Sequence, residues 1–158
     1  MVRIGEAADL FLAVRRGAVT GVSRTPQGHG ANVVFNRLRD RGYEVFPVNP
    51  NAEEVEGARS YPSLAAIPGG VAAVVIGTRP EHAMATVQEC VALGVPMVWM
   101  HRVAGGGSVS DDAARYGRMH GLLVIDGGCP LMFGATSDGG HRMLRRWATL
   151  TGAAPRRV

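Results

Sequence analysis

The chain has 158 residues, of which 46% are hydrophobic and 19% are charged, a composition typical of a folded domain and not of a disordered segment. All 17 basic residues are arginines, and with 13 acidic residues they give a net charge of +4. The arginines are scattered along the sequence, so we expect a basic solvated surface and no nucleic-acid partner.

Cysteine usage and apolar run lengths indicate the compartment. Two cysteines, Cys90 and Cys129, are too few for a disulfide framework or a four-cysteine zinc site. No apolar run approaches the ~18 residues of a membrane span, and acidic residues interrupt the N-terminal stretch where a signal peptide needs an unbroken apolar region. We therefore expect a cytoplasmic protein without a membrane partner. Its arginine, alanine and glycine usage is typical of GC-rich bacterial genomes.

Short apolar, β-branched segments predict five buried strands, over residues 18–22, 44–48, 71–76, 95–100 and 122–125. Helices are predicted between and around them, over residues 31–41, 80–93, from Ser110 to about 120, 6–14 and about 140–150. Strands alternating with helices predict an α/β fold, Rossmann-like and doubly wound, with a mainly parallel five-stranded sheet and helices on both faces.

The chain is expected to form a single domain over residues 1–158, with a C-terminal helical extension from about residue 138. Within that extension Met143, Trp147 and Leu150 recur at the spacing of one helix face, which predicts that they pack against the core. A short helix is also expected around residues 63–67, in the long linker before the third strand.

In a doubly wound sheet the ligand lies beyond the carboxyl ends of the strands, so the candidate site residues are those that follow each strand. They are Gly21, Val22, Ser23, Arg24, Thr25, Asn49, Pro50, Thr78, Arg79, Pro80, His101, Arg102, Cys129 and Pro130. Three of them, Arg24, Arg79 and Arg102, offer cations that suit a phosphate-bearing ligand.

The loop GVSRTPQGHG, residues 21–30, resembles a phosphate-binding turn before a helix, but it lacks the dinucleotide fingerprint. Counted from Gly21, the fingerprint needs glycines where Ser23 and Pro26 stand. The second strand is followed by Asn49 and not by the acid that binds a ribose hydroxyl in NAD sites. A phosphate-bearing ligand is therefore favoured over conventional NAD.

Five segments resemble the small stand-alone CoA-binding proteins, whose Rossmann-like domain is also the N-terminal domain of the succinyl-CoA synthetase α subunit. They are GVSR at 21–24, RGYEVFPVNPN at 41–51, YPSL at 61–64, VVIGTRPE at 74–81 and GGCPLMF at 127–133. The resemblance covers roughly residues 10–133, in order and with natural spacing.

This resemblance implies that coenzyme A or an acyl-CoA lies across the strand ends. Its phosphates would lie near residues 23–25, and its adenosine end near Asn49 and Pro50 or near the turn at 78–80. The turn at Cys129 and Pro130 is similar to the Asn-Cys-Pro turn near the CoA thiol in the synthetase, with Gly128 replacing Asn. The synthetase's phosphohistidine domain is absent from these residues, so binding without catalysis is expected.

Several alternatives stay open. The same cleft could serve an NAD(H)- or other nucleotide-binding redox enzyme or sensor, or it could be empty in an interaction protein. A homodimer through the C-terminal helix with Trp147 is a further alternative. Cys129 lacks an identifiable base, and the five histidines lack metal-ligand spacing, so we expect no catalytic and no metal residues.

Overall fold

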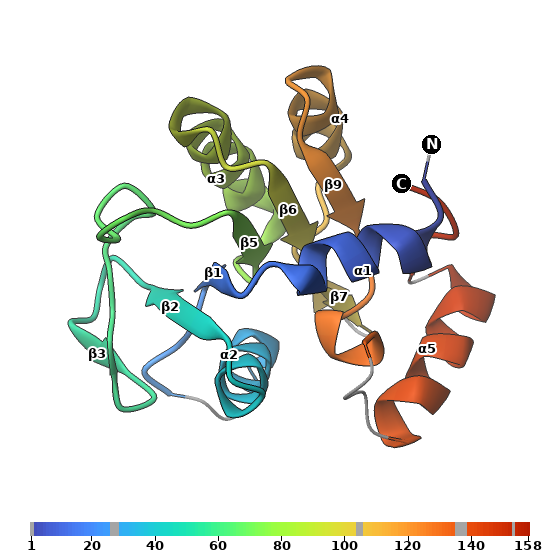
Figure 1. Ribbon diagram of the computed structural model, residues 1–158, viewed down its shortest axis with the longest axis horizontal. Coiled ribbons are helices and arrows are strands. Elements are labelled where there is room, and N and C mark those ends of the chain that lie inside the picture. The colour runs from blue at the N-terminus through green and yellow to red at the C-terminus, as the bar shows by residue number, and fades with distance from the viewer. Residues whose placement is uncertain (1, 26–28, 104–105, 135–138, 153) are drawn as a thin grey trace.

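A five-stranded parallel sheet forms the centre of the protein (Figure 1). The computed structural model describes residues 2–25, 29–103, 106–134, 139–152 and 154–158. The strand order is β2-β1-β5-β6-β9, with β1 at Arg16–Thr20, β2 at Glu44–Val48, β5 at Ala73–Ile76, β6 at Met97–Met100 and β9 at Leu123–Asp126. The predicted doubly wound α/β fold is confirmed, and the chain reverses direction across the sheet between β1 and β5.

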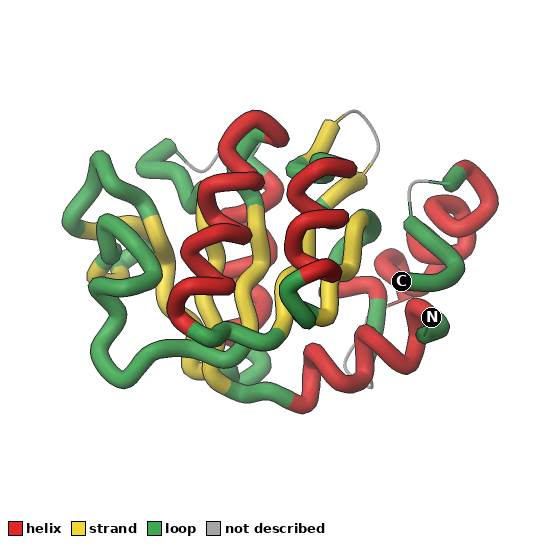
Figure 2. The backbone as a smooth tube through the Cα atoms, turned by 90° about the horizontal axis from the view of Figure 1, so that it is seen from above, coloured by secondary structure: helices red, strands yellow, loops and turns green. Residues whose placement is uncertain are grey.

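Helices cover both faces of the sheet, as the two views show (Figures 1 and 2). One face packs α3 (Pro80–Leu93) and α4 (Asp111–Met119), and the other packs α1 (Ile4–Ala13) and α2 (Gly30–Asp40). Side chains alternate between the two cores along each strand, so that Val75 and Trp99 face α1 and α2 while Val74 and Met100 face the other layer. The strands are thus buried on both sides, which explains their continuous apolar runs.

Local signals set the helix ends. Gly42 and Gly94 follow α2 and α3 with φ of 81° and 70°, a left-handed conformation that glycine adopts without steric cost. Ser110 caps α4, its hydroxyl accepting the Ala113 N–H at 3.3 Å. The predicted bounds of α3 and β2 are confirmed, whereas β1, β5, β6 and β9 differ by one or two residues at one or both ends.

The C-terminal helix α5 (Gly139–Thr151) is present, but the prediction of its packing face is wrong. Met143, Trp147 and Leu150 are 74%, 47% and 79% exposed, whereas Ala148 is buried and Leu144 is half-buried against the core. Ala148 and Leu144 form a second stripe at helical spacing, and this smaller stripe is the one that meets the protein.

Two-residue strands add two hairpins that the sequence did not predict. Strand β3 (Glu54–Val55) pairs with β4 (Ala58–Arg59), and β7 (Arg102–Val103) pairs with β8 (Gly106–Gly107). The expected helix at residues 63–67 is wrong: the segment forms successive turns, with the Ala66 N–H donating to the Ser63 carbonyl. The short 3-10 helix η1 (Pro130–Met132) follows the last strand.

Both outer strands of the sheet have partners on their outer sides. Next to β2, the Tyr61 N–H donates to the Pro47 carbonyl at 3.0 Å. Next to β9, the Arg118 guanidinium donates to the Val124 carbonyl at 3.1 Å and pairs with Asp126 at 2.8 Å. Among the described residues, no helix has the length and apolar character needed to cross a membrane.

Candidate functional site

The residues that follow the five strands form one continuous row at the carboxyl edge of the sheet. Backbone hydrogen bonds link neighbouring ends, from the Gly21 N–H to Val48, from Gly77 to Thr20, from His101 to Ile76 and from Gly127 to Met100. The row therefore brings together the candidate segments in the order of the strands: Asn49–Pro50, Gly21–Thr25, Thr78–Pro80, His101–Arg102 and Cys129–Pro130.

Two glycines let the backbones approach closely where strand order reverses. A Cβ added at Gly21, whose φ is 76°, would lie 2.6 Å from the backbone of Gly77. A Cβ added at Gly77 would lie 2.5 Å from the Cβ of Ala31 in the first turn of α2. Neither residue tolerates a side chain in this geometry, so glycine is required at both positions to bring strand ends and helix start together.

The start of α2 points its first N–H groups toward this row. His29 is the N-cap residue, and its side chain makes no capping hydrogen bond. The positive end of an 11-residue helix next to glycine backbone is an arrangement that favours anions. Residues 26–28 of the same loop, including the Pro26 that stands in place of a fingerprint glycine, lie outside the described residues.

A buried asparagine holds the loop after β1. Asn32 is 2% exposed; its Oδ1 accepts the Ser23 N–H, and its Nδ2 donates to the Ser23 carbonyl, both at 2.8 Å. Nδ2 also donates to Glu56 at 2.7 Å, and hydrogen bonds from Asn32 and Asn36 lower the pKa of that carboxyl. The backbone of Ser23 is thus fixed from both sides.

The predicted hydroxyls and amide near this loop also make bonds within the protein. Ser23 Oγ accepts the Thr25 N–H at 3.1 Å. Asn49 Nδ2 donates to the Val22 carbonyl at 2.9 Å, and Asn49 Oδ1 accepts the Asn51 N–H at 2.8 Å. Asn49 therefore ties the ends of β1 and β2 together.

The β5 end presents an unusual polar group. Thr78 Oγ1 is buried and has no hydrogen-bond partner among the described residues. A buried hydroxyl without a partner is destabilising, so it is a group that a bound polar molecule could satisfy after a small movement. The next residue, Arg79, is the N-cap residue of α3, and its Nε lies 3.8 Å from Oε1 of Glu81. Pro80 is the first residue of the helix.

His101 follows β6 directly and packs on the start of α2. It is 8% exposed, and a Cβ added at Gly30 would lie 2.8 Å from the His101 Cε1 atom. Burial lowers the pKa of His101 to about 4, so the imidazole is neutral at pH 7. A neutral ring next to the helix N-terminus adds a hydrogen-bonding group to the row without adding positive charge.

The β9 end closes the row with buried groups. The Arg102 N–H donates to the Gly128 carbonyl at 2.9 Å, which joins two of the predicted segments, while the Arg102 side chain is exposed. Cys129 is 4% exposed, and burial raises the pKa of its thiol to about 11. This thiol is protonated at pH 7 and is a poor nucleophile.

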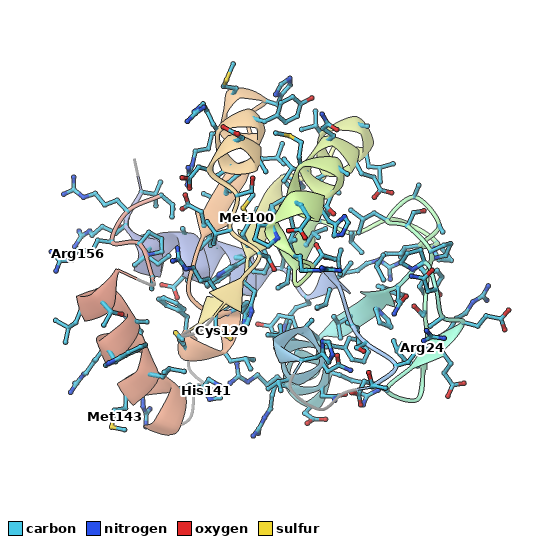
Figure 3. The ribbon with its side chains drawn as sticks, turned by 180° about the vertical axis from the view of Figure 1, so that it is seen from behind. Arg24, Met100, Cys129, His141, Met143 and Arg156 are labelled. Carbon is cyan, nitrogen blue, oxygen red and sulfur yellow. The ribbon has the colours of Figure 1, made fainter. Side chains whose placement is uncertain are left out.

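A groove of about 840 Å³ continues the row beyond β2. Predicted residues Asn49 and Pro50 line it together with the acidic Glu53 and Glu54 and the basic Arg59 from the β3–β4 hairpin. Arg24 is exposed in the neighbouring loop, and Figure 3 shows it well separated from Cys129. The row is therefore suited to an elongated ligand.

Three residues of this region are absent from the predicted site: Asn32, Glu56 and Arg59. Asn32 lies in a helix first turn, where a buried amide gives no sequence signal. Glu56 and Arg59 reach the region through the short β3–β4 hairpin, although Glu56-Gly57 is a turn signal that could have indicated it.

Two relatives align with about three quarters of this chain. The protein YneT of Bacillus subtilis, described as uncharacterized, is 28% identical over 120 residues, which cover 76% of this chain and 85% of YneT. The alpha subunit of acetate–CoA ligase [ADP-forming] II of Pyrococcus furiosus is 31% identical over 128 residues, which cover 77% of this chain but only 28% of the subunit.

A solved structure has the same fold over most of its length. It is a hypothetical protein of Pyrococcus horikoshii, with a TM-score of 0.73, 29% identity and coverage of 80% of this chain and 86% of that one. The family model for the CoA binding domain matches residues 15–135, which include all five main strands and every predicted site residue. The chain therefore belongs to the CoA-binding domain family, which confirms the resemblance found in its sequence.

Proposed function

We propose that this protein binds coenzyme A or an acyl-CoA across the carboxyl ends of its strands, without catalysing a reaction on it. The observation that carries the proposal is the close approach of Gly21 and Gly77 next to the start of α2, where the His29 side chain makes no capping hydrogen bond, in a chain of the CoA-binding domain family. Backbone N–H groups at such a helix start favour the diphosphate of the ligand.

The residues of the row divide between the two ends of an elongated ligand. The phosphates contact the loop at Ser23 and Thr25 together with the exposed cation of Arg24. The adenosine end occupies the groove at Asn49 and Pro50, and the thiol end lies toward Cys129, Pro130 and Arg102. His101 faces the middle of the ligand, as does the Thr78 hydroxyl, which lacks a partner in the part of the chain that the structure describes.

Arg59 lines the groove and is exposed, so it is the cation best placed for the 3′-phosphate of the adenosine end. Its guanidinium lies 5.5 Å from the centre of the Tyr61 ring, which restricts its position. The 3′-phosphate distinguishes CoA from dephospho-CoA, and this difference provides a direct test.

Isothermal titration with CoA and with dephospho-CoA tests the proposal. Arg59→Ala should weaken CoA binding about 10- to 100-fold and leave dephospho-CoA unchanged, because a charge-assisted hydrogen bond contributes roughly 1.5–3 kcal/mol. Arg24→Ala should weaken both ligands. Arg37→Ala, an exposed arginine in the last turn of α2, is the charge-matched control. Absence of heat and of a melting shift at millimolar CoA would overturn the proposal.

The competing proposal, an NAD(H)- or nucleotide-binding redox protein or enzyme, has a specific structural difficulty. Asn49 follows β2 where a conventional NAD site has an acid, and its Nδ2 and Oδ1 already bond within the protein, so no carboxylate is present there for a ribose hydroxyl. A saturable melting shift with NADH and none with CoA would favour this alternative.

We propose that residues 1–158 act as one domain in the bacterial cytoplasm, and cell fractionation with an antibody tests the location. The homodimer through α5 stays a prediction. Light scattering of the chain truncated after residue 135 tests it, because an unchanged oligomeric state would show that α5 is not part of an interface.

A further inference from the structure

The C-terminal 20 residues differ from the rest of the chain in charge. Residues 139–158 hold five arginines and no acidic residue, whereas residues 1–138 hold 12 arginines and 13 acidic residues. The positive net charge of the protein thus resides in α5 and the segment that follows it. The family match ends at residue 135, so this basic segment lies outside the shared CoA-binding domain.

The same segment exposes an apolar stripe. Met143, Trp147 and Leu150 lie at i, i+4 and i+7 on α5, and each is exposed, at 74%, 47% and 79%. The opposite side of the helix is held to the body by buried Ala148 and by Arg145, whose guanidinium lies 4.7 Å from the centre of the Phe133 ring. The stripe therefore faces away from the protein, as Figure 3 shows for Met143.

Four arginines accompany the stripe. They are Arg142 and Arg146 on α5 and Arg156 and Arg157 after it, all of them exposed. Their guanidinium groups make no hydrogen bond or ion pair with another residue of the described part of the chain. In Figure 3, Arg156 and Met143 lie on the same outer side of the molecule. An apolar stripe with unpaired cations next to it is the pattern of a helix that lies in a membrane interface.

We propose that this surface, formed by Arg142, Met143, Arg146, Trp147, Leu150, Arg156 and Arg157, binds the surface of an anionic lipid bilayer. The apolar side chains enter the headgroup boundary, where tryptophan is favoured, and the arginines pair with lipid phosphates. A second copy of the chain is a poorer occupant because pairing stripe to stripe would oppose arginines to arginines. The sequence-based expectation of no membrane partner rested on span length, which an interfacial helix does not need.

The two tryptophans allow a direct test on the intact protein. Trp99 is fully buried and Trp147 is half-exposed, so only Trp147 should change its fluorescence on vesicle binding. With vesicles of phosphatidylglycerol and phosphatidylcholine in equal parts, we expect a blue shift and co-sedimentation. Pure phosphatidylcholine vesicles should give neither. The shift should be absent in Trp147→Phe, which should still sediment.

Arginine variants measure how much the positive charges contribute to vesicle binding. Arg142→Gln with Arg146→Gln should weaken binding to the anionic vesicles roughly 25-fold, at about fivefold per arginine near a charged surface. The matched control is Arg37→Gln with Arg115→Gln, which also removes two exposed arginines but from α2 and α4, and it should bind unchanged. Circular dichroism and the melting temperature confirm folding of each variant. Equal binding to neutral vesicles, no binding to anionic ones, or a dimer by light scattering that shields Trp147 from acrylamide would overturn the proposal.

Discussion

The row of strand ends and the helix α5 are built in opposite ways. In the row, buried groups hold one another: Asn32 bonds Ser23 on both sides, and Trp99 Nε1 donates to the Gly127 carbonyl at 2.9 Å. On α5, the large apolar side chains and most arginines face solvent. The difference indicates that internal hydrogen bonds fix the positions of the residues in the row, whereas the exposed side chains of α5 are free to contact another molecule.

The two tryptophans give the largest expected contrast. Trp99 lies between Phe11 and Phe133, with ring centres 5.3 and 5.5 Å away, so Trp99→Ala should lower the free energy of unfolding by about 3–5 kcal/mol. Trp147→Ala removes a half-exposed side chain and should cost less than about 1 kcal/mol. Urea unfolding of both variants measures this difference, and equal losses would show that α5 is as tightly packed as the core.

Two glycines with the same φ provide a second comparison between the row and α5. Gly21 and Gly152 both have a φ of 76°, but only Gly21 has neighbouring atoms within reach of an added Cβ. Gly21→Ala should cost about 2–4 kcal/mol and abolish CoA binding, because the backbone at Gly77 must move. Gly152→Ala at the end of α5 should cost only about 1–2 kcal/mol and leave binding intact. Thermal melting with and without CoA measures the stability and the CoA binding of each variant. Backbone strain affects both variants, whereas crowding against the Gly77 backbone affects Gly21→Ala alone.

His101 should make the row sensitive to acid. Its pKa of about 4 in the folded chain lies below the ordinary 6.5, so the unfolded chain takes up the proton first as the pH falls. Its effect on stability should be absent above pH 6.5 and should reach a loss of about 2 kcal/mol by pH 5. Urea unfolding at pH 7.5 and pH 5 measures it. The loss should shrink in His101→Gln and persist in His82→Gln, which changes an exposed histidine; persistence in both would contradict the assignment.

The smallest expected difference in stability is between two hydrogen-bonding side chains. Asn32 joins α2 to the loop after β1, whereas Thr149 bonds within its own helix. Asn32→Ala leaves the Ser23 backbone unpaired and should cost about 1–2 kcal/mol. It should also raise the pKa of Glu56, because the Asn32 hydrogen bond is the main cause of its lowering. Nuclear magnetic resonance titration follows that carboxyl. Thr149→Ala, whose hydroxyl bonds Arg145 of its own helix, should change stability by less than about 0.5 kcal/mol.

The fold could be predicted from the sequence for physical reasons, and the same reasons indicate where a site would lie. Apolar runs bounded by glycine and by helix caps identify the strands, and parallel order then places the residues after each strand on one edge. The face that α5 buries was not predictable from spacing, because Met143 and Ala148 each belong to a stripe with helical periodicity. Arg59 was missed because two-residue strands have no periodicity to detect.

Both margins of the central sheet are closed to further strands. Proline at position 47 lacks a donor, and Tyr61 lies along β2; on the other side the Arg118 side chain covers the Val124 carbonyl of β9. Exposed sheet margins are templates for pairing between molecules, so these features protect the protein against aggregation through its strands. Replacing Arg118 by alanine would expose the Val124 carbonyl at one margin, and we expect more aggregation on storage than in the unchanged protein.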